Sequence, residues 1–566
     1  MDYDLLIRGG KIIDGSGLPG YLGDVGVKDG KIVELGRLRG SAARTIDATG
    51  LVVSPGFVDH HTHLDAQILW DPYGTSEPEN GVTSVVMGNC GLALAPVEDG
   101  VEEAIVKSFV RVEAMPREAL IEGVPWGWHS FGEYLDALEG KTGINVGGLI
   151  GHIALRQTVM GEESVEREAT PAEVERMKAL VREGMEGGAL GISTNRNSRH
   201  YREDGKPVAS RLASLDELFE LSDVLAEMNS GVIETIANLS DEEQIAWYDQ
   251  LARRTARPVI WQSVLHRYSA PDFWRVQLEA IAPTFRDGYR AYGLANTVPI
   301  YNRFNLNNAQ VFDEWPTWKN IMFLPEFVRK QAFSDPETRA KLKAEFAEKR
   351  YTNFHKRWDL IPVVEVAKPE NERYLGKTIA ELGEMRRQDP VDAMIDLSLE
   401  EDLKTTFLSA NGGDPEAMGQ IMRSPYVLIG VSDAGAHVQF NASFGYSTTL
   451  LGLHVRERGA MPLEQAIYKL TFQVASVYGL NDRGLLRPGY AADVCVFNPE
   501  TVRARDWEWV QDYPANTRRL AQKADGIEYT IVNGTVIYEG GRLTGALPGH
   551  VLRGSAYAGR PEPVLV

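Results

Sequence analysis

The stretch that decides the fold is Pro55-Gly56-Phe57-Val58-Asp59-His60-His61-Thr62-His63. It reads as an apolar strand that ends in histidines, and His61 and His63 stand two positions apart. Side chains two positions apart project from the same side of a strand, so these imidazoles can converge on one metal ion. A hydrogen-bonded surface turn is the alternative, but three histidines within four positions are hard to explain as packing. The stretch therefore predicts a metal site at a strand end, where catalytic residues gather in barrel folds.

Outward from this strand, the chain alternates short apolar runs with amphipathic helical stretches from about residue 55 to residue 480. The apolar runs include residues 84–87, 146–150, 189–192, 231–233, 258–260 and 426–430. Repeated strand and helix units favour a parallel sheet, and their number favours a (β/α)₈ TIM-like barrel over an open sheet. The pattern lapses between about 266 and 357, a segment rich in aromatic and charged residues that we interpret as an inserted lid.

Both ends of the chain read as short strands separated by turns. Residues 1–54 and 481–566 place apolar runs beside Asp-Gly and Asn-Gly dipeptides, which are hairpin signals. Small sheets must bury one face, so we expect both ends to join in one β-sandwich domain beside a barrel formed by residues 55–480.

Composition limits the class of protein and its partners. The chain has 566 residues, 43% hydrophobic and 24% charged, as expected of a globular protein. A net charge of −20 argues against nucleic acid and membrane partners and leaves a small-molecule substrate. Two cysteines form no disulfide framework, the first residues are acidic, and no apolar run is long enough to span a bilayer, so we predict a cytoplasmic protein. A homo-oligomer is compatible with the sequence.

Several motifs give the chain a family resemblance. Beside residues 4–15 and 55–63, they lie at residues 81–91 (with Asn89-Cys90-Gly91), 151–156, 188–194, 432–437 and 486–493. The chain resembles the amidohydrolase superfamily and, more narrowly, the N-acyl-D-amino-acid deacylase (D-aminoacylase) group. The resemblance implies a metal-dependent hydrolase with one or two zinc ions, or another divalent metal.

The resemblance also implies the residues of the metal centre. His61 and His63 correspond to metal ligands, and Cys90 corresponds to a thiolate ligand, although a small buried hydrophobe is the alternative for that cysteine. Asp433 corresponds to a carboxylate that binds the metal and carries the proton from water to the leaving nitrogen. A helix cap is the alternative for Asp433.

Five residues are candidate substrate contacts. His152 and Arg156 follow an apolar run, and the arginine would pair with a substrate carboxylate or, alternatively, form an interhelix salt bridge. Arg196 and His200 follow the run at 189–192. His437 is a further metal ligand, a substrate contact or a plain loop histidine, and the sequence does not rank these roles.

The chain also departs from the group's pattern. Histidines are expected after the fifth and sixth strands, but the sequence has Glu234 and Gln262 in those regions, and Glu234 is a candidate substitute ligand. We expect hydrolysis of an amide C–N bond, with an N-acyl amino acid of D configuration implied by the resemblance. Hydrolysis of a cyclic amide, carbamate or lactone is the alternative within this class, and a non-catalytic binding protein on the same barrel is the alternative outside it.

Overall fold

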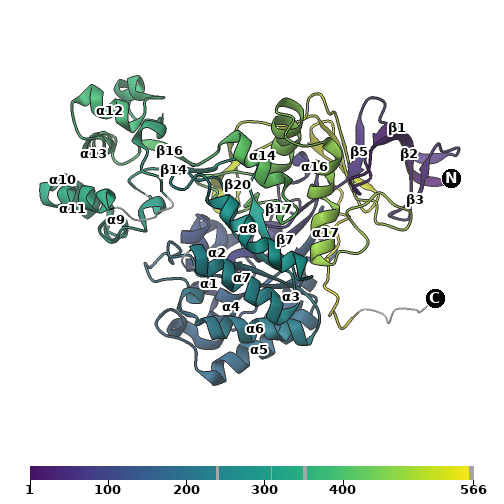
Figure 1. The fold of residues 1–566 in the computed structure, drawn as a ribbon, viewed down its shortest axis with the longest axis horizontal. Coiled ribbons are helices and arrows are strands. Elements are labelled where there is room, and N and C mark those ends of the chain that lie inside the picture. The colour runs from purple at the N-terminus through teal and green to yellow at the C-terminus, as the bar shows by residue number, and fades with distance from the viewer. Residues whose placement is uncertain (238–240, 308, 349–353, 560–566) are drawn as a thin grey trace.

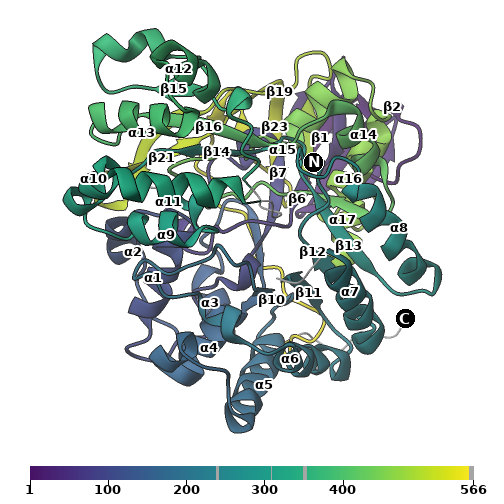
Figure 2. The same ribbon diagram turned by 60° about the vertical axis from the view of Figure 1, so that its left-hand side comes forward.

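A closed parallel barrel lies at the centre of the computed structural model, which describes residues 1–237, 241–307, 309–348 and 354–559 (Figure 2). Its strands pair in the order β6-β7-β8 and β9-β10-β11-β12-β13-β17. They are β6 (Phe57–Asp59), β7 (Val82–Met87), β8 (Asn145–Gly148), β9 (Ile150–Gly151), β10 (Gly191–Asn195), β11 (Val232–Ile236), β12 (Val259–Trp261), β13 (Ala291–Ala295) and β17 (Val427–Ile429).

Two local features make these strands one barrel of eight positions. Strands β8 and β9 are separated by Leu149 alone, whose N–H donates to the carbonyl of Met87 on β7. The barrel closes beyond β6 and β17, where Thr62 and Ala434 form a parallel bridge and the N–H of His63 donates to the carbonyl of Ala434 at 2.7 Å. The predicted TIM-like barrel is therefore confirmed.

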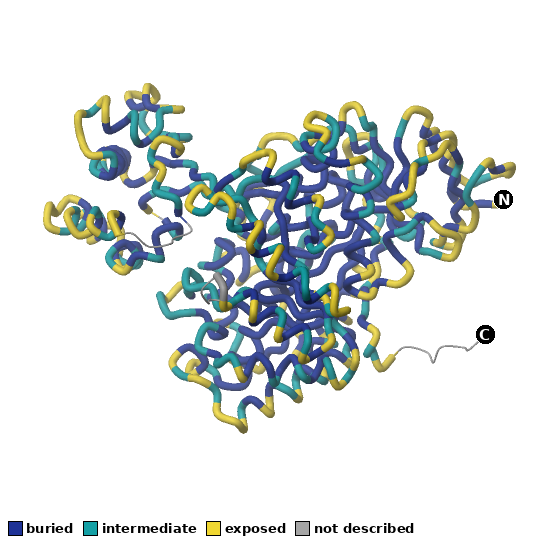
Figure 3. Tube along the Cα trace, viewed as in Figure 1, coloured by how far each residue is buried: buried dark blue, intermediate teal, exposed yellow. Residues whose placement is uncertain are grey.

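Each of the eight barrel positions contributes an apolar side chain, from the strand or from a residue next to it, to one buried cluster that fills the barrel. These side chains include Val58, Val86, Leu149, Leu190, Val232, Ile260, Leu294 and Leu428. Figure 3 shows this buried centre and the exposed positions along the outer helices. The helices that follow the strands are α3 (Phe131–Leu138), α4 (His152–Met160), α5 (Pro171–Glu186), α6 (Leu215–Glu227), α7 (Asp241–Thr255), α8 (Phe273–Arg286), α14 (Pro415–Arg423), α16 (Leu463–Leu470) and α17 (Phe472–Tyr478).

The two ends of the chain meet in a nine-stranded sheet, the β-sandwich portion of the fold. Strand β5 pairs with β1 on one side and with β18 on the other, so that Val53 lies opposite Val496. The strands are β1 (Tyr3–Ile12), β2 (Tyr21–Lys28), β3 (Lys31–Gly36), β4 (Ala42–Asp47), β5 (Val52–Pro55), β18 (Val494–Phe497), β23 (Ile527–Val532), β24 (Thr535–Glu539) and β25 (Arg542–Leu543). Cys495 is buried on β18, and both cysteines are free thiols.

A separate lobe projects from the barrel, at the left of Figure 1, between β13 and β17. Its apolar core runs from Phe304 to Phe407 and is distinct from that of the barrel. It contains β14 (Ile300–Phe304), β15 (Val363–Glu365) and β16 (Thr406–Asn411), with helices α9 (Pro316–Met322), α10 (Glu326–Ser334), α11 (Pro336–Ala347), α12 (Ile379–Arg386) and α13 (Pro390–Glu400).

The lobe corrects the predicted insertion at both ends. Residues 266–295, which we assigned to the lid, instead supply α8 and β13 of the barrel, and the lobe extends past 357 to β16. The start was misplaced because α8 is rich in aromatic and charged residues, although its buried positions Trp274 and Ile281 pack on the barrel. Within the described ranges, no helix is both long and apolar enough to cross a membrane.

Candidate active site

The structure brings His61, His63 and Cys90 together at the carboxyl end of the barrel. Both histidines follow β6, and Cys90 lies in the short turn Asn89–Gly91 after β7 with a left-handed φ of 55°. One ligand atom from each residue lies within 4.8 Å of the other two, and Cys90 Sγ is 3.6 Å from His61 Nε2. All three are buried. Imidazole nitrogen and thiolate sulfur are the donors that zinc prefers, so this donor set fits the metal that the resemblance implies.

Asp433 completes this group from the last barrel strand. Its Oδ1 is 3.3 Å from His61 Nε2 and 3.9 Å from His63 Nε2. The Asp433 N–H donates to the carbonyl of His61, which ties the two strand ends together. The next helix, α15 (Tyr446–Thr449), begins well beyond this residue and has no side-chain cap, so Asp433 caps no helix here.

The charges of these groups depend on burial and on their neighbours. Burial raises the pKa of Asp433, but the hydrogen bond and charge of His61 outweigh it and lower that pKa below its usual value. Burial, together with the charges of Glu234 and Glu113, raises the pKa of the Cys90 thiol well above its usual value. A metal ligand must be the thiolate, so metal binding has to release the Cys90 proton.

Glu234 and Gln262 occupy the strand ends where the group's histidines were expected. Glu234 lies on β11, and its Oε2 accepts a hydrogen bond from the Cys90 N–H at 2.9 Å. Its Oε1 is buried without a hydrogen-bond partner and lies 3.9 Å from His61 Nδ1. Gln262 Nε2 lies 2.7 Å from His61 Nε2 and 3.4 Å from Cys90 Sγ. The Glu234 carboxylate and the Gln262 amide therefore both lie beside His61 and Cys90.

Glu113 is a site residue that the sequence interpretation missed. It follows α1 (Glu102–Val112) and is buried, with Oε1 3.6 Å from His63 Nδ1 and Oε2 3.8 Å from His437 Nδ1. Burial, with the charge of Asp433 next, raises the pKa of Glu113 well above its usual value. No motif marks this position, because its role depends on where α1 ends in space.

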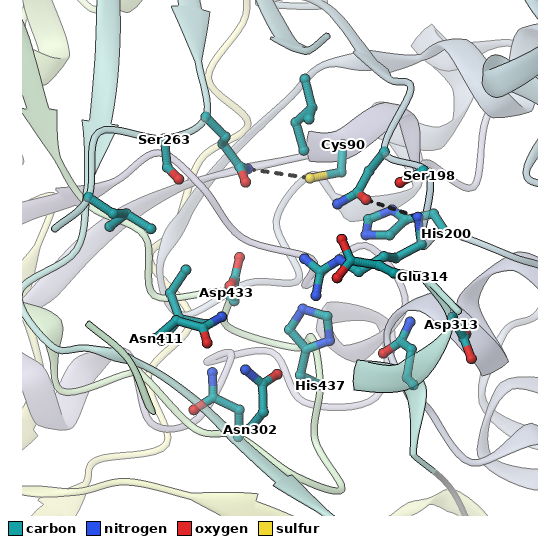
Figure 4. Close-up of a pocket in the computed structure, with 18 of the residues that line it drawn as sticks. Cys90, Ser198, His200, Ser263, Asn302, Asp313, Glu314, Asn411, Asp433 and His437 are labelled. Carbon is teal, nitrogen blue, oxygen red and sulfur yellow. Dashed lines mark hydrogen bonds between the residues drawn. The ribbon is translucent and has the colours of Figure 1, made fainter. Parts of the chain in front are cut away.

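A cavity of about 720 Å³ opens beside His63, Cys90 and Asp433, which are among the residues that line it (Figure 4). Cys90, Asp433 and His437 line it together with His200 from the loop after β10. The lobe contributes Tyr301, Asn302, Asp313, Glu314, His355 and Asn411 to the same wall. The predicted contacts His200 and His437 thus lie where a substrate can reach them, whereas Arg196 is not among the lining residues.

His152 and Arg156 lie elsewhere, which corrects their interpretation as substrate contacts. Both are fully buried in α4 and do not line the cavity. His152 Nε2 is 2.8 Å and Arg156 Nη1 2.7 Å from Glu217 Oε1 on α6, and His152 Nδ1 is 2.8 Å from the hydroxyl oxygen of Thr194. Arg156 thus forms an interhelix salt bridge with Glu217, which was the alternative that the sequence offered for this arginine.

The sequence model of the amidohydrolase family matches residues 44–313 and 347–538, most of the chain and all the ligand positions above. The chain belongs to the amidohydrolase family. Two relatives from Alcaligenes xylosoxydans xylosoxydans are a D-aminoacylase, 28% identical over 98% of each chain, and an N-acyl-D-glutamate deacylase, 29% identical over 99% of this chain and 98% of that one.

Solved structures of this amidohydrolase type agree with the fold. A D-aminoacylase structure has a TM-score of 0.69 at 25% identity, covering 97% of this chain and 100% of the other. The N-acyl-D-glutamate deacylase from Bordetella bronchiseptica, solved with zinc and a phosphonate inhibitor, has a TM-score of 0.67 at 25% identity, over 98% and 100%. This amidohydrolase is therefore a metal-dependent enzyme that hydrolyses C–N bonds other than peptide bonds.

Proposed function

We propose that this amidohydrolase deacylates N-acyl-D-amino acids. The observation that carries the proposal is the placement of Asp433 Oδ1 beside both His61 and His63, at the floor of a cavity large enough for a small substrate. The D-aminoacylase and the D-glutamate deacylase among its relatives support the choice of substrate class.

His61, His63 and Cys90 would hold the metal, with Asp433 as the fourth donor. The metal supplies Lewis-acid chemistry, because it polarises a carbonyl and makes water a stronger acid. Asp433 is deprotonated at neutral pH, since its pKa is lowered, and its carboxylate accepts the proton of the attacking water and then donates it to the leaving nitrogen. The cavity beside Asp433 would hold the acyl group close to these residues.

Metal content and stereochemistry test the proposal together. Elemental analysis of protein purified without added metal should find about one tightly held zinc per chain, because the described ligands form one set of four donors. Assays on paired N-acyl-D- and N-acyl-L-amino acids should show turnover of the D series. Turnover of the L series alone would contradict the proposed configuration.

A second candidate reaction follows from Glu234 and Gln262, which stand where histidines were expected and change the polar groups beside Cys90. If neither acyl series is hydrolysed by metal-loaded protein, a panel of cyclic amides, carbamates and lactones is the next test. Absence of metal and of all turnover would favour the binding-protein alternative. A cytoplasmic location and any oligomeric state stay predictions.

A further inference from the structure

The loop after β10 directs two arginines to the cavity above the metal ligands. Arg199 and Arg211 both line this cavity, as do Ser198 before Arg199 and His200 and Tyr201 after it. Arg211 lies further along the loop, in the turn Ala209–Leu212. Figure 4 shows Ser198 and His200 on this wall, facing the side of the cavity that carries His437 and Asp433.

The guanidinium of Arg199 is not engaged within the described part of the chain, although its charge acts on Asp313 across the cavity. Among the described residues, no hydrogen bond or ion pair involves its guanidinium group, and its Nε is buried without a hydrogen-bond partner. Leaving buried N–H groups unpaired is costly, so such a group in a cavity wall indicates that a ligand supplies the acceptor.

Arg211 is held in place but keeps its charge uncompensated. Its Nη1 donates to the carbonyl of His200 at 3.0 Å, and its guanidinium lies over the ring of Tyr201 at 4.5 Å. No carboxylate of the described chain lies within ion-pairing distance of it. Of the three described arginines that line the cavity, Arg199 and Arg211 come from this loop, whereas Arg267 follows β12.

The carboxylates that line the same cavity each lie beside a group other than Arg199. Asp313 accepts two hydrogen bonds from Arg111 Nη2, at 2.8 and 3.0 Å, which tie the lobe to α1. Asp433 faces His61 and His63, Glu113 faces His63 and His437, and Glu314 has an interaction of its own. None of these acids forms an ion pair with Arg199 in the described structure.

We propose that Arg199, supported by Arg211, binds a carboxylate of the substrate. A guanidinium matches a carboxylate in planar, two-pronged geometry, which makes the site selective for an anion over a neutral amide. The proposal rests on the amide-hydrolase function above, but not on the configuration of the substrate. The carboxylate that Arg199 binds is either the α-carboxylate of the substrate or the carboxylate of an acidic substrate side chain.

Matched substrates separate these sources. For Arg199→Ala we expect kcat/KM on the recognised anion to fall roughly tenfold to a hundredfold, mainly through KM, because a hydrogen bond to a charged group is lost. N-acetyl-D-glutamate against N-acetyl-D-glutamine tests the side-chain carboxylate, and N-acetyl-D-leucine against its amide tests the α-carboxylate. Arg199→Lys should restore part of the loss, since it keeps the charge but not the fork.

Arg196→Ala is the matched control, because Arg196 lies in the same loop, is partly buried and does not line the cavity. It should leave the preference for anions unchanged. An equal loss on charged and neutral substrates with Arg199→Ala, or no loss on either, would overturn the proposal.

A binding measurement separates this proposal from the proposed function. Calorimetric titration of the metal-loaded protein with glutarate should show binding that weakens at least tenfold in Arg199→Ala and persists in Arg196→Ala. If no N-acyl amino acid is hydrolysed but glutarate binding still depends on Arg199, only the proposed function fails. Glutarate binding that is absent, or unaffected by Arg199→Ala, would refute the carboxylate site itself.

Discussion

The centre around His61 and the cluster around His152 are both buried near the ends of barrel strands, but their polar atoms differ in what they bind. At the first, His63 Nδ1, Glu113 Oε2 and Glu234 Oε1 have no hydrogen-bond partner among the described residues. At the second, both ring nitrogens of His152 are bonded, to Thr194 and Glu217, and in the described structure only Nε of the Arg156 guanidinium lacks a partner. Unsatisfied buried groups beside a cavity indicate a ligand site, whereas satisfied groups indicate a structural one. The same residue types thus serve function in one place and stability in the other.

The largest expected effect comes from Asp433→Asn, which removes the proton carrier and keeps the shape. We expect kcat/KM to fall about 10²–10⁴-fold, the usual contribution of acid-base catalysis. Because the folded state lowers the pKa of Asp433, the variant should also lose some free energy of unfolding at neutral pH, so activity is compared at equal fractions of folded protein. Steady-state kinetics with urea unfolding checks both. Retained activity would show that the centre around His61 does not carry the reaction.

The Glu217→Ala change should lower the stability of the fold and leave catalysis largely intact. It leaves Arg156 buried without its carboxylate, which should cost about 3–5 kcal/mol in the free energy of unfolding. Urea unfolding measures the loss, and kcat of the folded protein should stay near that of the wild type. The double variant Arg156→Met/Glu217→Leu should be more stable than Glu217→Ala, because no buried charge is left unpaired. A collapse of kcat in folded Glu217→Ala would break the distinction between the two clusters.

Cys90→Ser tests whether the first centre holds a metal. Loss of a residue that only hydrogen-bonds to a metal ligand typically weakens metal binding about 10–100-fold. Loss of the sulfur donor itself should weaken zinc binding by more than this. Competition with a chromogenic chelator measures the affinity, and Cys495→Ser, at the other buried free thiol, is the matched control and should bind zinc normally. Equal affinity of wild type and Cys90→Ser would exclude the thiolate as a ligand.

The smallest expected effect is the pH dependence of the second cluster. Burial raises the pKa of Glu217, but His152 and Arg156 outweigh it, so the pKa is lowered in the folded state. Its stabilisation is therefore present above the unfolded pKa near 4.5 and is lost as pH falls through the folded pKa, by at most about 1.4 kcal/mol per pH unit. The free energies of unfolding of wild type and Glu217→Gln, measured from pH 7 downward, should converge in acid. A constant difference would contradict this assignment.

The sequence predicted the barrel and the centre of the site because both rest on local patterns. Apolar runs bounded by turns located the strands, and the His-x-His spacing indicated that the imidazoles of His61 and His63, just after β6, lie close together. Glu113, Arg199 and Arg211 were not predicted, because only the three-dimensional path of the loops brings them to the cavity, whereas Arg196, the arginine that was predicted, does not line it.

For Arg156, the sequence pattern fits two roles and does not decide between them. An arginine after an apolar run reads equally as a substrate contact or as a salt bridge, and its partner Glu217 lies on another helix, far along the chain. The lobe was misplaced for a similar reason, since α8 resembles the lobe in composition and differs only in what it packs against.

The pairing of β5 with β18 has a consequence for how the molecule is assembled. Strands from opposite ends of the polypeptide lie side by side, and the barrel between them closes only when β17 reaches β6. Such high contact order makes folding slow, because distant segments must find each other before their contacts give any stability. A ribosome-bound chain that stops before residue 427 has neither barrel closure nor Asp433, so the enzyme becomes active only late in synthesis.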